Sequence, residues 1–321
     1  MVQWRTLIAS ALMMLVSAQA LAEESAEQWV HRMLTAAREV SYHGQSILFS
    51  GGKVTSLDIY HAPIDHQIWE RVVHLSGEPA EILRKGSSII CLYPGSSSRL
   101  KVQSSPLGKL TALEQSAQTV SHYYRFKQAG YDRVAGREAV RIDVQPLDQF
   151  RYGYSLWLDK ATGVLLKSQT NPAEGDPLEI FEFVSLEIGK PIPRSAFEPS
   201  PDLKAANPPV QLNTPAHVVP DNGAWEADWL PDGFRQAGRT STRADKPDMS
   251  ARVYTDGLAA FTIFYEPKAP THHETTRSHG ATVAVNHLLP GSDAMVTVVG
   301  EVPLITADKV AENVKLVAAR H

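Results

Sequence analysis

Hydrophobic residues recur with two different periods along this chain, and each change of period marks a change of element. In residues 24–40 they recur at helical spacing, so that Trp29 and Met33 share one stripe. Ser25 stands just before this stripe and Gln28 follows three residues later, which is the spacing of a capping box. The pattern predicts an amphipathic helix over residues 24–40.

After residue 42 the period changes to two, which is typical of β-strands. Glycine- and proline-containing turns separate the alternating runs, and no helical run lies between them. Such even spacing predicts an antiparallel meander and excludes β–α–β units. The predicted strands are residues 47–49, 57–60, 68–73, 81–83 and 88–93, with turns at residues 51–52, 62–65 and 77–79.

A second helix is predicted at residues 107–128, where apolar residues return to helical spacing. More β-type runs follow, and in one of them Tyr152 and Tyr154 share a face while Trp157 lies on the other. About ten or eleven strands and two or three helices are expected before residue 190. The later strands are residues 131–134, 139–144, 152–158, 164–168 and 178–188.

A sheet of this size with so few helices covers its inner face incompletely. A curved antiparallel sheet lined with apolar residues can then enclose a cavity, which is a first hint of a lipid-type ligand. An ordinary filled core produces the same periodicity. The pattern alone therefore leaves both interpretations open.

Residues 191–223 separate two domains. They contain eight prolines among Ser, Ala, Asn and Asp, and proline neither donates to a sheet ladder nor continues a helix. The composition predicts an extended, semi-rigid linker between an N-terminal domain, residues 23–190, and a smaller C-terminal domain, residues 224–321.

The C-terminal domain is predicted to combine an antiparallel sheet with one helix. The helix is expected at residues 306–317, with Thr306 as its N-cap and Val310, Val314 and Val317 on one face. The whole chain is thus mainly β, of the α+β class. The predicted strands of this domain are residues 251–255, 260–266, 281–288 and 295–302.

The first 22 residues have the pattern of a secretory signal peptide. Arg5 supplies the positive charge, residues 7–16 form a short apolar run, and Ala20-Leu21-Ala22 is a cleavage site of the A-x-A type. The apolar run is too short for a membrane span, which needs about 20 residues. The sequence predicts export and cleavage after Ala22.

Composition and motifs exclude several classes of function. A net charge of −4 argues against nucleic acid as the main partner, and the single cysteine, Cys91, excludes a disulfide framework or a Cys-rich metal site. The stretch from His273 to Arg277 has arginine where a zinc-binding helix needs its second histidine, so a solvated loop is the favoured interpretation even with His272 and His279 nearby. The sequence predicts no catalytic residues, no cofactor and no metal site.

Five stretches resemble the RseB/MucB family, and they occur in the family's order across nearly the whole chain after the signal peptide. Chance agreement of all five is implausible. The stretches are VAGREAV at 134–140, RYGYSLWLD at 151–159 with Thr162-Gly163, WLPDGF at 229–234, YTDGLA at 254–259 and MVTVVGEVPL at 295–304.

The resemblance implies an N-terminal domain shaped like the lipoprotein carriers LolA and LolB, which is an antiparallel β half-barrel with covering helices. It further implies a non-enzymatic periplasmic regulator that binds the periplasmic segment of a single-span anti-sigma factor of the RseA/MucA type. Binding would shield that segment from the first, DegS-type protease and keep an envelope-stress sigma factor inactive. Lipid, lipopolysaccharide or lipoprotein acyl chains would release the regulator.

The candidates for lining the ligand cavity are Phe49, Trp69, Tyr93 and Trp157, and each is equally readable as a core residue. The partner-contact residues are not predicted, although both domains are expected to contribute to them, and a homo-oligomer remains open. The alternative function is a periplasmic lipid or lipoprotein carrier. A periplasmic hydrolase is disfavoured by the missing motifs.

Overall fold

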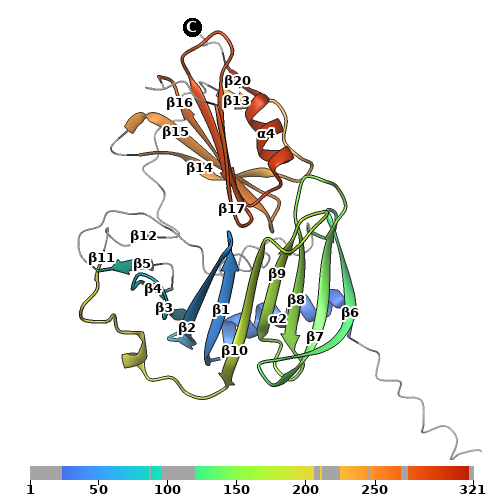
Figure 1. The fold of residues 1–321 in the computed structure, drawn as a ribbon, viewed down its shortest axis with the longest axis vertical. Helices are drawn as coiled ribbons and strands as arrows, with labels where there is room; N and C mark the ends of the chain where they lie inside the picture. The colour runs from blue at the N-terminus through green and yellow to red at the C-terminus, as the bar shows by residue number, and fades with distance from the viewer. Residues whose placement is uncertain are drawn as a thin grey trace, which may run out of the picture.

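The computed structural model describes residues 24–86, 88–94, 120–205, 210–211, 225–243, 246–268 and 274–317. These residues form two β domains, with helix α2 on the larger sheet and helix α4 on the smaller one (Figure 1). The prediction of a mainly β fold with a large antiparallel sheet is confirmed. No helix within the described ranges is long and apolar enough to span a bilayer.

The N-terminal sheet is a meander whose two halves meet where β1 pairs with β10. Its strand order is β11-β5-β4-β3-β2-β1-β10-β9-β8-β7-β6, with β12 also on β5. The elements are α2 Ala26–Glu39, β1 Tyr42–Ser50, β2 Lys53–Ile64, β3 Gln67–His74, β4 Glu81–Lys85, β5 Ser88–Tyr93, β6 Tyr124–Val134, β7 Arg137–Pro146, β8 Gly153–Asp159, β9 Leu165–Asn171, β10 Glu179–Ile188, β11 Lys204–Ala205 and β12 Val210–Gln211.

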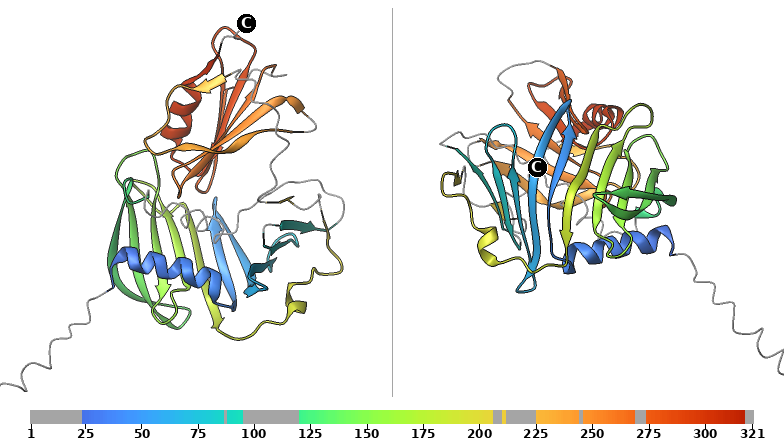
Figure 2. Two further views of the ribbon diagram at one scale, coloured as in Figure 1. Left: turned by 180° about the vertical axis from the view of Figure 1, so that it is seen from behind. Right: turned by 60° about the horizontal axis from the view of Figure 1, so that its bottom comes forward.

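Helix α2 is capped as the sequence predicts. The Ser25 hydroxyl accepts a bond from the Gln28 backbone at 3.2 Å, while the Gln28 side chain accepts one from the Ser25 backbone at 2.6 Å. The helix buries Trp29, Met33 and Leu34 in the main core and lies across the inner face of the curved sheet (Figure 2). It covers the end of that face farther from the C-terminal domain.

The prediction of a helix at residues 107–128 is wrong at the C-terminal end of that range. Residues 107–119 lie outside the described ranges, but Tyr124 to Gln128 begin strand β6. Tyr124 and Phe126 both pack into the core, and pairing with β7 outweighs the helical spacing of Val120 and Tyr124. The turn expected at residues 62–65 is also later than predicted, because β2 continues to Ile64.

Part of the predicted linker packs against the outer face of the N-terminal sheet. A 3₁₀ turn, η1 Arg194–Phe197, places the fully buried Phe197 edge-to-face on Trp69 with ring centroids 5.9 Å apart. Beyond it, β11 and β12 pair with β5. Residues 194–205 therefore pack on the N-terminal domain, and the extended, semi-rigid linker over residues 191–223 stays a prediction.

A buried ion pair holds this segment in place. Arg71 donates to Glu81 at 2.9 Å, and Ser200 donates both its hydroxyl and its backbone N–H to the same carboxylate. Burial alone would raise the pKa of Glu81, but hydrogen bonds from Arg71 and Ser200 outweigh it and hold the pKa below its usual value.

We expect Glu81→Ala to lower the free energy of unfolding by about 3 kcal/mol at neutral pH, because Arg71 loses its buried partner. Since the folded pKa of Glu81 is depressed, its contribution is present above the unfolded pKa of about 4.3 and is lost as the pH falls through the folded value. Urea denaturation at pH 7 and about pH 3 should show the difference shrinking with acid. Glu138→Gln, which removes an exposed pair with Lys160, should change neither curve.

The C-terminal sheet has the order β14-β15-β16-β19-β18-β17, and α4 packs on one face of it (Figure 1). The strands predicted at residues 251–255, 260–266, 281–288 and 295–302 are present, although the first begins five residues earlier, at Lys246. The elements are β13 Trp225–Ala227, β14 Arg235–Arg243, β15 Lys246–Thr255, β16 Ala260–Glu266, β17 Thr275–His279, β18 Thr282–Leu288, β19 Met295–Gly300, α4 Leu304–Glu312 and β20 Val314–Leu316.

Two expectations for this domain are wrong. The terminal helix begins directly after Pro303 rather than at Thr306 and ends before Val314, which lies in β20 paired with β13. The loop expected after residue 273 is partly an edge strand, β17. Its residues are polar and mostly exposed, so the sequence shows no alternation that would predict a strand.

Candidate functional site

The two domains are joined by a buried ion pair. Arg151, in the loop before β8, donates to Asp256, in the turn after β15, at 2.9 Å, and neither side chain is exposed to solvent. Arg151 also donates to the backbone oxygen of Asp232 at 2.6 Å and pairs with Asp148 at 3.0 Å. A buried charge pair is stable only when its remaining donors and acceptors are satisfied, and here they are.

The Asp256 carboxylate is anchored from both sides. One oxygen accepts the backbone N–H groups of Leu258 and Ala259, and the other accepts both Arg151 and the Tyr124 hydroxyl, the latter at 3.1 Å. Burial, reinforced by neighbouring negative groups, raises the pKa of Tyr124 well above its usual value. The hydroxyl therefore stays protonated and keeps donating across the domain junction.

Aromatic rings enclose the Arg151 guanidinium. Its central carbon lies 4.9 Å from the ring centroid of Tyr123, 5.6 Å from that of Tyr124 and 5.2 Å from that of Phe234. Cation–π contacts of this kind are strongest when the cation is desolvated, as it is here. Rings from both domains thus contribute to holding one charge.

A second contact lies beside the ion pair. Phe150 packs edge-to-face on Trp229 with ring centroids 5.1 Å apart, and Lys309 of α4 lies 4.1 Å from the Trp229 ring. The Thr306 hydroxyl, predicted as a helix cap, instead donates to the Phe150 backbone oxygen at 2.8 Å. The first turn of α4 is therefore fixed to the N-terminal domain.

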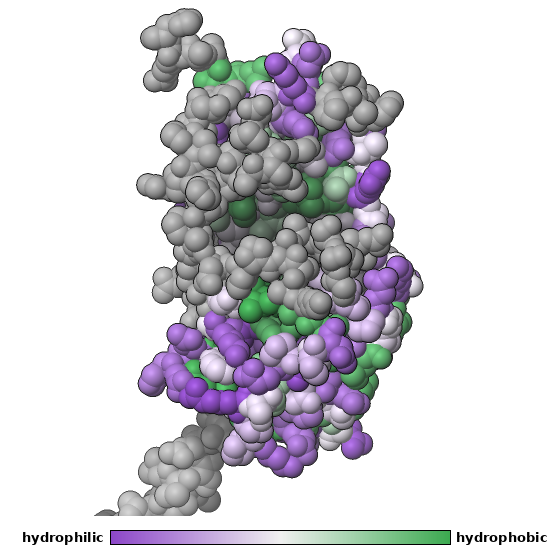
Figure 3. All heavy atoms as spheres, turned by 90° about the vertical axis from the view of Figure 1, so that its left-hand side faces the viewer, coloured by the Kyte–Doolittle hydropathy of each residue, from purple (hydrophilic) through white to green (hydrophobic). Residues whose placement is uncertain are grey.

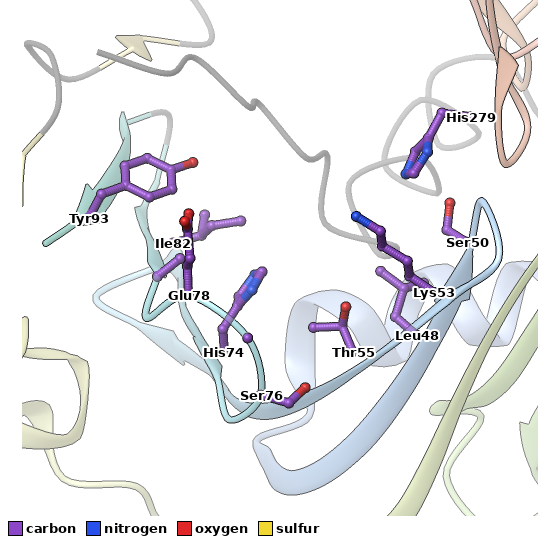
Figure 4. Close-up of a pocket in the computed structure, with 12 residues that line it drawn as sticks. Leu48, Ser50, Lys53, Thr55, His74, Ser76, Glu78, Ile82, Tyr93 and His279 are labelled. Carbon is purple, nitrogen blue, oxygen red and sulfur yellow. The ribbon is translucent and has the colours of Figure 1, made fainter. Parts of the chain in front are cut away.

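A pocket of about 450 Å³ opens at the end of the inner sheet face that α2 leaves uncovered. Leu48 and Ile82 give it an apolar side, Lys53 and His74 a polar one, and His279 reaches it from the C-terminal domain (Figure 4). Burial lowers the pKa of His74. Hydrophobic surface is also visible in the hollow between the domains on this side of the molecule (Figure 3).

Turns from the two domains meet at the edge of this pocket. Gly51, between β1 and β2, has φ +56°, and a side chain built there would collide with the His279 ring. Gly280, beside His279, would in the same way collide with Ser50 and Glu179. Glycine at both positions permits this close approach.

Of the four candidates for cavity lining, Tyr93 lines the pocket, and its ligand role stays a prediction. Phe49 follows the pocket residue Leu48 in β1, so it points to the opposite face of the sheet. Trp69 lies on that outer face under Phe197.

Trp157 also lies away from the pocket, in a small outer cluster with residues such as Leu166. Its ring is stacked between Arg141 and Lys167, with the cations 5.1 and 4.9 Å from the centroid, and its N–H donates to Asp132 at 2.9 Å. The prediction that Trp157 and Tyr154 occupy opposite faces of the strand is confirmed.

Cys91 and the histidines near residue 273, to which the sequence assigned no chemistry, lie in or near the two sheets where the structure describes them. Cys91 is half-buried in β5, and burial raises the pKa of its thiol. His279 lines the pocket at the end of β17, whereas His272 and His273 lie outside the described ranges.

Fold and junction together define a two-domain β protein with a ligand-sized pocket beside the contact between its domains. Residues 25–201 match the MucB/RseB N-terminal domain, and residues 219–315 match the MucB/RseB C-terminal domain. The chain belongs to the MucB/RseB family.

Relatives and solved structures agree with this assignment. The chain is 34% identical over 314 residues to the sigma factor AlgU regulatory protein MucB of Pseudomonas aeruginosa, covering 95% of each chain. It is 27% identical over 318 residues to the sigma-E factor regulatory protein RseB of Escherichia coli K12, covering 96% of each. The structure of the Pseudomonas aeruginosa MucA/MucB complex matches with a TM-score of 0.75 at 31% identity, covering 92% of this chain and 99% of that one.

Four of the junction residues fall within the stretches on which the family resemblance rests. Arg151, Asp232, Phe234 and Asp256 come from three of them, although nothing in their spacing reveals that they meet. The family resemblance therefore marked the stretches that contain these residues, but the sequence did not show that the residues form a contact between the domains.

Proposed function

We propose that this chain is a periplasmic negative regulator of an envelope-stress sigma factor. It binds the periplasmic segment of a MucA/RseA-type anti-sigma factor and shields it from DegS-type proteolysis. The observation that carries the proposal is the match to MucB in complex with MucA, which extends over both domains and 92% of the chain.

The arrangement of the two domains supports the same proposal. The chain matches MucB bound to MucA with TM-scores of 0.75 and 0.73, but MucB alone with 0.63. Sequence identity is nearly the same in the three comparisons, at 31, 30 and 28%, so divergence of sequence does not account for the difference. The chain is thus more similar to MucB bound to MucA than to MucB alone, and the contact between Arg151 and Asp256 is proposed as part of the partner-binding arrangement.

Export and absence of catalysis are part of the proposal. Residues 1–22 act as a cleaved signal peptide that delivers the chain to the periplasm. The protein is non-enzymatic, in keeping with relatives that are named as regulatory proteins. Regulation of proteolysis by occlusion of a substrate segment requires binding alone.

Release of the partner by a lipid is energetically reasonable. A ligand that shifts a complex from 99:1 to 1:99 must prefer the partner-free form by about 10⁴-fold, or about 5.5 kcal/mol. Each buried methylene contributes about 0.8 kcal/mol, so roughly seven methylenes suffice. The pocket beside the domain junction, with apolar and polar sides, is the proposed place for such a ligand.

A second candidate function is a lipid or lipoprotein carrier. The pocket on the inner face of a half-barrel favours it. A carrier would retain lipid through purification and deliver it to a membrane. It would not bind an anti-sigma factor.

Calorimetry with the mature chain, residues 23–321, and the purified periplasmic segment of a MucA/RseA-type protein distinguishes the two. The regulator should bind with a Kd of about 1 μM or tighter, which is about −8 kcal/mol. Lipopolysaccharide should weaken this binding. A folded chain that ignores the segment but carries lipid would favour the carrier instead.

A further inference from the structure

Three side chains with metal-binding groups meet between α4 and the C-terminal sheet. They are His287 of β18 and Asp308 and Glu312 of α4, and one ligand atom from each lies within 4.8 Å of the others. Asp308 and Glu312 stand four residues apart, so they share one side of the helix. The Nε2 atom of His287 lies 3.0 Å from Asp308 Oδ1.

The backbone that carries these groups is well fixed. Ala307, Val310 and Ala311 of α4 are fully buried against the sheet, and β18 is hydrogen-bonded on both sides, to β17 and β19. Ligand groups on a packed helix and an inner strand keep their separation more closely than groups on loops.

A fourth side chain lies on the other side of the imidazole. Oε1 of Glu274 lies 3.7 Å from the Nδ1 atom of His287, on the opposite side of the ring from Asp308. Histidines that bind metals through one nitrogen usually direct the other to a carboxylate, which fixes the tautomer and orientation of the ring. In His287 the Nε2 atom faces Asp308, and the Nδ1 atom is turned toward the Glu274 carboxylate.

The charge around the imidazole is unbalanced. Three carboxylates surround it, and among the described residues no lysine or arginine forms an ion pair with any of them. Lys309, the lysine of α4, stacks instead on Phe150 and Trp229. A cation between these carboxylates would lower their mutual repulsion.

We propose that His287, Asp308 and Glu312 bind one divalent transition-metal ion, with Zn²⁺ as the best match. Imidazole and carboxylate are both zinc ligands, whereas Ca²⁺ and Mg²⁺ take oxygen ligands and make little use of histidine. Water completes the coordination on the solvent side.

The site has a structural consequence for the rest of the protein. A metal ion there cross-links α4 to β18, and α4 contacts the N-terminal domain through Thr306. Zinc therefore stabilises one of the elements that contact the N-terminal domain. The sequence alone gives no hint of the site, because His287 stands 21 positions before Asp308 and lies in a separate element, strand β18.

Metal-stripped mature protein tests the proposal by calorimetry with Zn²⁺ and by visible absorption with Co²⁺ as a spectroscopic probe. One ion per chain should bind, and His287→Gln and Asp308→Asn should each weaken binding by at least about 100-fold and remove the Co²⁺ bands. Glu274→Gln, which removes the group behind the ring, should cost about 10- to 100-fold.

Matched controls exclude binding elsewhere. His31→Gln on the exposed face of α2 and Asp293→Asn in the β18–β19 turn should leave Zn²⁺ affinity unchanged. Asp308 is half-exposed, so its substitution leaves the fold intact, which thermal unfolding without metal verifies. Equal Zn²⁺ affinity in the parent, His287→Gln and Asp308→Asn proteins, or no binding to the parent, overturns the proposal.

Discussion

Replacing Asp256 with alanine should destabilise the protein by about 3–5 kcal/mol and weaken binding of the anti-sigma segment. Arg151 would lose its fully buried partner and keep only Asp148, which is partly exposed, and removal of one partner of a buried pair typically has this cost. Tyr124 would lose its acceptor at the same time. Urea denaturation followed by tryptophan fluorescence measures the first effect, and calorimetry with the partner segment measures the second.

A double variant separates the charge from the contact. Arg151→Met combined with Asp256→Leu removes both charges, so stability should return most of the way to that of the parent, as buried pairs replaced by apolar residues generally allow. Partner binding should stay weaker, because the bonds from Arg151 to Asp232 and from Asp256 to its own turn are gone.

Asp159→Ala is the matched control. Asp159 is also buried and paired with an arginine, Arg137 at 2.7 Å, but both residues belong to the N-terminal domain. Its loss should reduce stability while leaving partner affinity close to that of the parent. An Asp256→Ala protein with the stability and affinity of the parent would contradict the role assigned to the junction.

The second large effect concerns the pocket. Ile82→Trp should fill part of the space of about 450 Å³ and raise the lipopolysaccharide concentration needed to displace the partner by at least about 10-fold. Partner affinity without lipid should change little, because the pocket serves the competing ligand. Competition calorimetry at several lipid concentrations measures both quantities.

Val54→Trp provides the comparison for this substitution. Val54 is 64% exposed and is paired with Phe49 on the face of the sheet opposite the pocket residue Leu48. The added ring should leave lipid sensitivity unchanged. Equal lipid sensitivity in the Ile82→Trp and parent proteins would remove the pocket as the site of the lipid.

Local physics made much of the fold predictable. The capping residues and the apolar stripe of α2 were sufficient to predict this helix. The alternation of apolar and polar residues, together with glycine turns, was sufficient to predict most strands of both sheets. Strands β14 and β17 were not predicted. Their residues are largely polar, so the sequence shows no alternation of apolar and polar positions there. Tyr124 was assigned to a helix because its spacing from Val120 fits one.

The faces of the aromatic residues were harder to assign. Trp69 and Trp157 lie in strands with apolar residues on both faces, which is unusual for a sheet with one side open to water. Phe197 from the proline-rich segment covers Trp69, and two cations cover Trp157. Neither covering group could be inferred from the strand in which the tryptophan lies.

The domain junction could not be derived from spacing at all. Arg151 and Asp256 are separated by 105 positions, and each reads alone as a surface charge beside a turn. Only folding brings them together. The family resemblance marked the stretches that contain them without indicating that they form one contact.

The most direct test of the regulatory function is the rate at which a DegS-type protease cleaves the anti-sigma periplasmic segment. Saturating mature protein should slow cleavage by at least about 10-fold, and lipopolysaccharide should restore the rate of the free segment. The Asp256→Ala protein should protect less at the same concentration. Cleavage at an unchanged rate, with folded protein in excess over the segment, would contradict the account.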